Sequence, residues 1–87
     1  MPEAIVLINT NIGAEEEVMN ELLRIEGISE AYIVYGVYDI VVKIKAPSTE
    51  TLKEIISSKI RKISNVRSTL TMIVVEGREI TPSYLKT

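Results

Sequence analysis

The segment from Tyr35 to Asp39 holds side chains well suited to bind a small polar ligand. A free amino acid carries an ammonium group, which pairs with a carboxylate, and a carboxylate, which accepts hydrogen bonds from backbone N–H groups or hydroxyls. Asp39 can pair with the ammonium, and the open backbone around Gly36, with Val37 beside it, can donate N–H groups. The hydroxyls available for the same purpose are those of Tyr35, Tyr38, Thr69 and Thr71. Such a set favours amino-acid binding.

The same residues also fit a purely structural role. In that interpretation Gly36 supplies a positive φ, Asp39 starts a strand and the tyrosines fill space at a sheet edge. Thr69 and Thr71 are likewise common in strands that bind nothing. The residues alone leave both interpretations open.

The absence of two residue types excludes several kinds of catalytic and metal site. The 87 residues include no cysteine and no histidine. Disulfides, thiolate metal sites and thiol nucleophiles are therefore excluded, and the commonest general base is missing. Glu15, Glu16 and Glu17 are adjacent, so on a helix they cannot converge on one cation. We therefore expect no enzyme activity, no cofactor and no metal site.

Charge and hydropathy favour a protein partner over nucleic acid or membrane. The net charge is −2 with a pI near 5.1, and the one basic cluster, Lys59, Arg61, Lys62 and Arg67, suits the end of a helix. Hydrophobic residues make up 46% and the mean hydropathy is +0.20, which favours self-association of so small a chain. The uncharged stretch 4–14 is too short to span a bilayer and no basic signal-peptide segment precedes it, so a cytoplasmic location is expected.

The spacing of apolar residues predicts six elements in the order βαββαβ. Residues 4–8 form a β-branched run typical of a strand buried on both faces. Strands at 28–35 and 38–45 flank Gly36 and predict an antiparallel hairpin. A first helix is expected at 14–26 and ends at Gly27. A second helix is expected from a hydroxyl cap at 47–49 to about Lys62. The last strand is expected at 66–76 and ends at Gly77.

This order predicts one α+β domain, residues 1–77, with a ferredoxin-like fold, and an irregular tail, 78–87, available to contact a neighbour. The four-stranded antiparallel sheet should have the order 4-1-3-2, with both helices on one face. The residues expected on the bare face are Val6 or Leu7, Val41, Ile73 and Val75. A second copy of the chain is expected to cover that face.

Three short motifs stand in a characteristic order. The turn Gly36-x-Tyr38-Asp39, followed by Ile40-Val41-Val42-Lys43-Ile44, lies between Ile25-Glu26-Gly27-Ile28 and Arg67-Ser68-Thr69-Leu70-Thr71. In order and spacing they resemble the amino-acid-sensing domain of the Lrp/AsnC transcriptional regulators, the regulation-of-amino-acid-metabolism (RAM) domain. The resemblance covers about Ile5 to Glu76, nearly the whole chain.

The resemblance implies a homodimer formed through sheet faces, assembled further into a ring-like octamer or similar, with amino-acid effectors at contacts between dimers. The family's ligand turn corresponds to Tyr35, Gly36, Val37, Tyr38 and Asp39, and Thr69 and Thr71 are weaker correspondences. The family's helix-turn-helix has no counterpart, because the first strand begins almost at Met1. We therefore expect no direct DNA binding, and an effect on transcription or amino-acid metabolism through partners such as full-length regulators.

Three alternatives predict different behaviour. An ACT-like regulatory domain has the same element order but binds amino acids at the loop after strand one, here Asn11-Ile12-Gly13. A dimeric ferredoxin-like enzyme would depend on Asp39, Tyr38 or a lysine, with its pocket inside one dimer. A purely structural assembly module would form the same rings without saturable binding of any amino acid.

Overall fold

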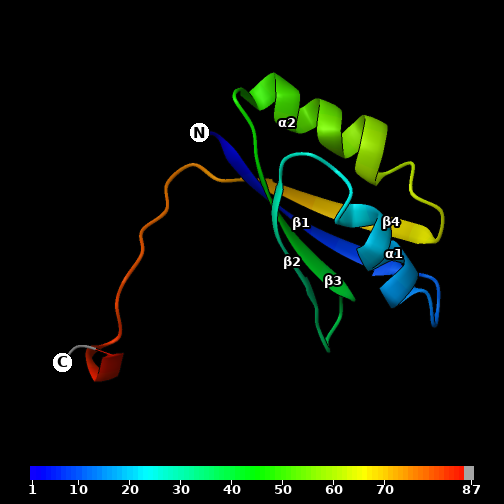
Figure 1. Cartoon of the computed structure of the whole chain (residues 1–87), viewed down its shortest axis with the longest axis horizontal. Coiled ribbons are helices and arrows are strands. Elements are labelled where there is room, and N and C mark those ends of the chain that lie inside the picture. Colours follow the sequence, from blue (N-terminus) through cyan, green and yellow to red (C-terminus); the bar gives the residue numbers. More distant parts are fainter. Residues whose placement is uncertain (86–87) are drawn as a thin grey trace.

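The computed structural model describes residues 1–85 and has the predicted ferredoxin-like fold. Four antiparallel strands form one sheet in the order β2-β3-β1-β4, and α1 and α2 pack on the same face of it (Figure 1). The elements, in chain order, are β1 (Glu3–Thr10), α1 (Glu15–Leu22), β2 (Ile28–Ile33), β3 (Ile40–Lys45), α2 (Thr49–Ile55), a π-helical turn (Ile56–Ile60), β4 (Val66–Ile73) and a 3-10 turn (Ser83–Leu85).

The core lies between the helices and one face of the sheet. Ala4, Val6 and Ile8 of β1 are fully buried there, together with Val18 and Leu22 of α1. The residues between them in β1 are only half-buried, so the prediction of a strand buried on both faces was wrong. The reason is that both helices cover the same face, which leaves the other face to solvent in a single copy.

The helices are shorter than predicted. After Leu22, α1 gives way to turns, and the chain reverses at Gly27, which has φ +106°. The predicted hydroxyl cap of α2 is confirmed, since the Thr51 N–H donates to Ser48 Oγ at 3.1 Å. The regular α-geometry ends at Ile55, and one π-helical turn carries the helix on to Ile60.

Three strand ends also differ from the prediction. β2 stops at Ile33 and β3 starts at Ile40, because the bond from the Val34 N–H to the Asp39 carbonyl closes the hairpin and leaves residues 34–39 as a loop. β4 ends at Ile73, because its partner β1 begins at Glu3, and the bond from the Val74 N–H to the Glu3 carbonyl is the last that β1 can supply.

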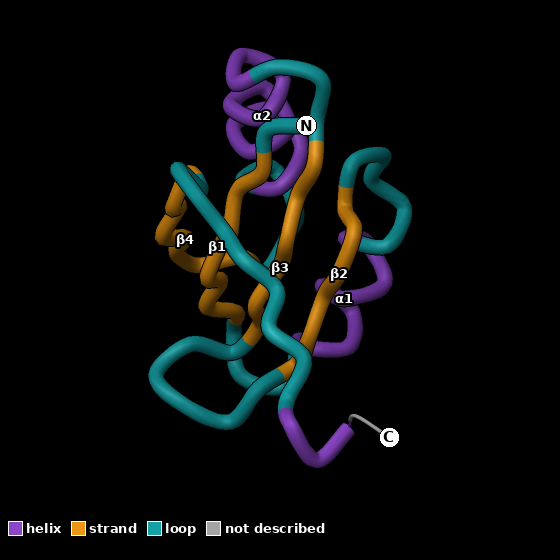
Figure 2. Tube along the Cα trace, turned by 90° about the vertical axis from the view of Figure 1, so that its left-hand side faces the viewer, coloured by secondary structure: helices purple, strands orange, loops and turns teal. Residues whose placement is uncertain are grey.

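The bare face of the sheet, called the open face below, carries an apolar patch. Cross-strand pairs put its members side by side: Leu70 opposite Leu7, Met72 opposite Ile5, and both Leu7 and Tyr32 opposite Val41. Figure 2 shows this face toward the viewer, with the helices behind it. The patch consists of Ile5, Leu7, Tyr32, Val41, Leu70 and Met72.

One of the residues expected on the open face, Ile73, lies elsewhere. Val6 is buried against the helices, so Leu7 is the outward member of that pair. Ile73 pairs with the core residue Ala4, and it therefore lies on the helix side, where it shares a groove with Ile56. Val75 lies past the end of β4 and borders a groove at the open face with Ile5 and Lys43. The residues of β4 that face the open side are Leu70 and Met72.

Residues 74–85 lead away from the sheet and end in the 3-10 turn (Figure 1). The predicted boundary after residue 77 stays a prediction, and the part of the tail at Lys86 and Thr87 lies outside the described residues. Among residues 1–85, neither helix has the length and apolar character that crossing a bilayer requires.

Candidate functional site

Asp39 immediately precedes β3 and is hydrogen-bonded to β1. Its N–H donates to the Ile8 carbonyl at 3.0 Å, and its Oδ2 accepts from the Thr10 N–H at 2.8 Å and from the Thr10 hydroxyl at 3.4 Å. Thr10 is only 3% exposed, so Asp39 satisfies a buried donor beyond the last β1–β3 pair. Among residues 1–85, the hydrogen bonds of the Asp39 carboxylate are accepted by Oδ2 and none by Oδ1.

The rest of the predicted ligand turn projects into solvent. Tyr35, Gly36 and Val37 are exposed at the tip of the loop, whereas Tyr38 is half-buried at its base. Gly36 does not have the positive φ expected of it, and a Cβ built on it would meet nothing within 4 Å. Its role is therefore not a strained turn, and its backbone is open to approach. In a single copy the loop does not surround a ligand.

Thr69 and Thr71 do not meet this loop within one copy. Thr69 pairs with Ile8 and Thr71 with Val6, so both lie on the helix side of β4. β1 separates β4 from β3 and its loop, a distance of about two strand spacings, or roughly 10 Å. The seven predicted site residues thus fall into two groups, which only a contact between copies could join.

The loop favoured by the ACT-like alternative has a structural role. The Asn11 side-chain amide donates to Asn65 Oδ1 at 2.8 Å, and the Asn11 N–H donates to the Asn65 carbonyl at 2.9 Å. The Asn65 side-chain amide in turn donates to Glu17 at 3.3 Å. Asn65 adopts φ 74°, a conformation that asparagine tolerates. This network joins the β1–α1 loop to the turn before β4.

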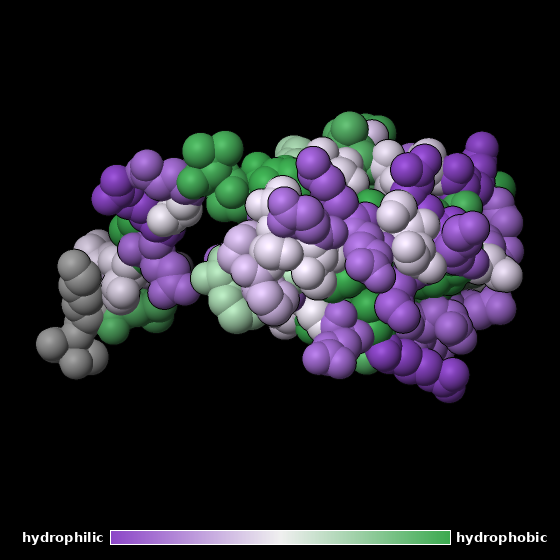
Figure 3. All heavy atoms as spheres, turned by 90° about the horizontal axis from the view of Figure 1, so that it is seen from above, coloured by the Kyte–Doolittle hydropathy of each residue, from purple (hydrophilic) through white to green (hydrophobic). Residues whose placement is uncertain are grey.

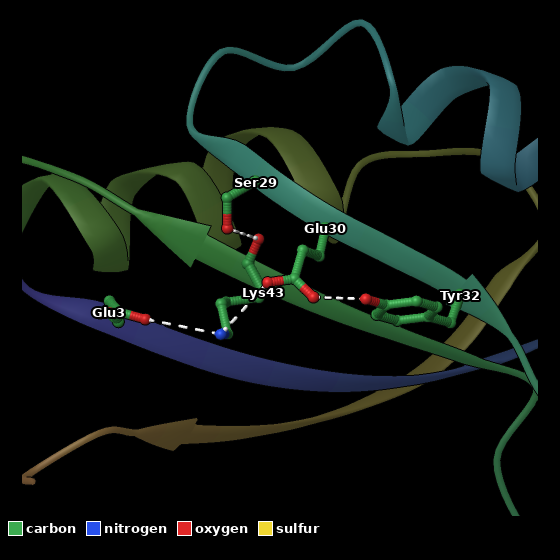
Figure 4. Close-up of polar contacts among 5 residues, drawn as sticks. All are labelled: Glu3, Ser29, Glu30, Tyr32 and Lys43. Atoms are coloured by element: carbon green, nitrogen blue, oxygen red, sulfur yellow. Dashed lines mark hydrogen bonds and ion pairs between the residues drawn. The ribbon is translucent and has the colours of Figure 1, made fainter. Parts of the chain in front are cut away.

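A polar network on the open face was missed by the sequence analysis. Lys43 Nζ lies 3.3 Å from Glu30 and 4.0 Å from Glu3, and the Tyr32 hydroxyl donates to Glu30 (Figure 4). The Tyr32 hydrogen bond and then Lys43 lower the pKa of Glu30, and the same contacts to Glu30 raise the pKa values of Tyr32 and Lys43. The charges alternate with apolar residues along the strands, which is the signal that could have found them.

Comparison with known proteins gives one consistent result. The family model described as the Lrp/AsnC ligand binding domain matches residues 3–83. The solved structure of FFRP-DM1 is 41% identical, with a TM-score of 0.82, and the match covers 86% of this chain and 100% of that one. The hypothetical protein PHS023 from Pyrococcus horikoshii is 40% identical, with a TM-score of 0.82, covering 88% of this chain and 93% of that one.

Curated relatives are longer than this chain. The transcriptional regulator FL11 of Pyrococcus abyssi is 37% identical over 78 residues, which are 90% of this chain and 51% of that protein. The chain spans about half the length of such regulators, or less, and 12% of a homocitrate synthase from Sulfolobus acidocaldarius that it also matches. The likeness therefore concerns one domain of these proteins.

Proposed function

This chain belongs to the Lrp/AsnC ligand-binding domain family, and from that premise we propose that it senses a free amino acid and forms the oligomer that carries the binding site. The observation that carries the proposal is the family match over residues 3–83, which includes the loop with the free Asp39 oxygen. The amino acid would modulate transcription or amino-acid metabolism through a partner protein in the cytoplasm.

The open face supports assembly into a dimer. Six apolar side chains gather there on a face that neither helix covers. Exposed apolar patches of this kind mark protein contacts, and a two-fold axis would set the patch of one copy on that of another. The Glu30–Lys43–Glu3 network lies beside the patch and would fix the register of the two sheets.

The site for the amino acid would form where dimers meet in a ring-like assembly, because the loop alone is too exposed to enclose a ligand. Asp39 Oδ1 would accept from the ligand ammonium, and the backbone at Gly36 would donate to its carboxylate. Tyr35, Val37 and Tyr38 would line the side-chain space. Thr69 and Thr71 would join only if a neighbouring copy supplied them.

Regulation would pass through another chain. Both helices within residues 1–85 pack on the sheet (Figure 1). Relatives such as FL11 are transcriptional regulators about twice as long as the matched part, so a full-length regulator sharing this domain is the partner proposed. The homocitrate synthase match is too short to imply that enzyme's reaction here.

The proposal is tested by thermal shift over the twenty amino acids, read beside the mass in solution. We expect a small set of amino acids to raise the melting temperature of a dimer or larger oligomer. Asp39→Asn keeps an acceptor for Thr10 but loses the charge, and should weaken binding by about 1.5–3 kcal/mol. Ile12→Ala, in the other loop, is the matched control and should bind normally. An oligomer that no amino acid stabilises would support a purely structural module instead.

A further inference from the structure

The segment after β4 carries apolar side chains that are mostly exposed in their own copy. Four of its apolar side chains are exposed, Val75 by 98%, Ile80 by 85%, Tyr84 by 83% and Leu85 by 62%. Figure 3 shows apolar surface on this segment, which stands apart from the body of the molecule. Exposure of these apolar side chains to water is unfavourable, and burial against a surface outside their own copy would stabilise them.

The direction of the segment identifies that surface. It starts at the open face, where residues 74–79 border a groove of about 560 Å³ together with Glu3, Ile5 and Lys43. From there it runs outward on the side of the sheet away from the helices, and in Figure 2 it crosses in front of the open face. It therefore extends into the space that a second copy would occupy.

We propose that residues 78–85 form an arm that grips the second copy seated on the open face, with Ile80, Tyr84 and Leu85 packed on that copy. The proposal rests on the sheet-face dimer proposed above and adds a second contact to it. The two-fold axis gives each copy one arm to donate and one to receive, so the arms act twice per dimer. They would slow dissociation of the dimer once the two sheet faces are in contact.

The arm is tested in the intact chain by the dimer dissociation constant, measured by light scattering or sedimentation. Replacing both Ile80 and Tyr84 by serine, or removing residues 78–87, should weaken the dimer by about tenfold or more, which is 1.4 kcal/mol per tenfold. Replacing both Arg78 and Glu79 by serine is the matched control, because it changes the same segment without removing apolar surface or net charge, and should leave the dimer unchanged.

The absence of cysteine allows a direct test of which copy the arm touches. Tyr84→Cys, carrying a thiol-linked photo-crosslinker, is mixed with a tagged wild-type chain. Crosslinks between the two chains are expected, and crosslinks confined to one chain would overturn the proposal. A wild-type dimer that is unaffected by the Ile80 and Tyr84 changes would overturn the arm alone, whereas a wild-type monomer would overturn the sheet-face dimer as well.

Discussion

The Asp39 carboxylate accepts hydrogen bonds from both the backbone N–H and the hydroxyl of Thr10, 29 residues earlier in the chain. The same side chain therefore holds the end of β1 and offers its second oxygen at the proposed ligand loop. The structural interpretation of Asp39 predicted only a local contact at the start of a strand, and the contact with Thr10 shows that its structural role is wider.

Removing this carboxylate should cost stability as well as binding. In Asp39→Ala the buried Thr10 N–H loses its acceptor, and the free energy of unfolding should fall by about 1–3 kcal/mol. Asp39→Asn should recover most of that loss. Urea unfolding followed by circular dichroism measures both variants. Equal stability of Asp39→Ala and the wild type would show that water replaces the carboxylate at Thr10.

Replacement by alanine should cost much more stability at Gly27 than at Gly36. Gly27 has φ +106°, and its Cβ would come within 2.9 Å of the Ile55 Cδ1 atom and 3.2 Å of the Lys45 carbonyl oxygen. Gly27→Ala should therefore cost roughly 2–5 kcal/mol, from backbone strain together with the overlap. Gly36→Ala meets open space, and should change stability by less than about 1 kcal/mol. Thermal melts of the two variants would contradict this if Gly27→Ala were the milder change.

A charge on the open face should separate the copies. Leu70→Glu puts a carboxylate in the middle of the apolar patch, where a face-to-face dimer would bury it twice, and burial of an unpaired charge costs several kcal/mol. We expect the dimer to weaken by about 100-fold or more. Asn20→Glu adds the same charge on α1 and serves as control. Sedimentation would refute the sheet-face contact if both variants stayed dimeric.

The Glu30–Lys43 pair should give a pH dependence with a definite sign. The folded pKa of Glu30 is lowered from 4.5, so its stabilising effect is complete above that value and is lost as the pH falls through the lowered pKa. The folded pKa of Lys43 is raised from 10.5, so its effect is complete below that value and is lost as the pH rises through the raised pKa. Both groups are partly exposed in one copy, so the effect on unfolding should be small.

Urea unfolding at a series of pH values measures this effect, with Glu30→Gln as the reference. The wild type should lose its advantage over Glu30→Gln at acidic pH, and the two should then have the same stability. A constant difference from neutral to acidic pH would mean that the network does not act through the Glu30 charge.

The sequence was sufficient for the fold because βαββαβ periodicity and crossover handedness leave few topologies. It was not sufficient for the faces of β1 and β4. A run such as residues 4–8 is apolar at every position, so periodicity cannot tell Val6, which faces the core, from Leu7, which does not. The strand ends depended on partners, since β4 stops just before Val74, whose N–H makes the last hydrogen bond to β1, at the Glu3 carbonyl.

The loop at residues 34–39 could be located from Gly36 and Asp39, but its contacts could not. The link from Asp39 to Thr10 spans two strands far apart in sequence, and no local spacing encodes it. The open-face network arises in the same way, from the register between β2 and β3 and a shift between Ile28 and Glu30. The site between copies remains a prediction, supported by the family match.

The π-helical turn that follows α2 contains one residue more than an α-helical turn would need to span the same length. The Arg61 N–H reaches back five residues to the Ile56 carbonyl, and the surplus is taken up by the exposed residues between the buried Ile56 and Ile60. Loss of the exposed Ser58 would let the turn relax to ordinary α-geometry, with Ile55 and the former Ile60 still facing the sheet. At this turn the chain can therefore lose one residue while the same side chains stay buried in the core.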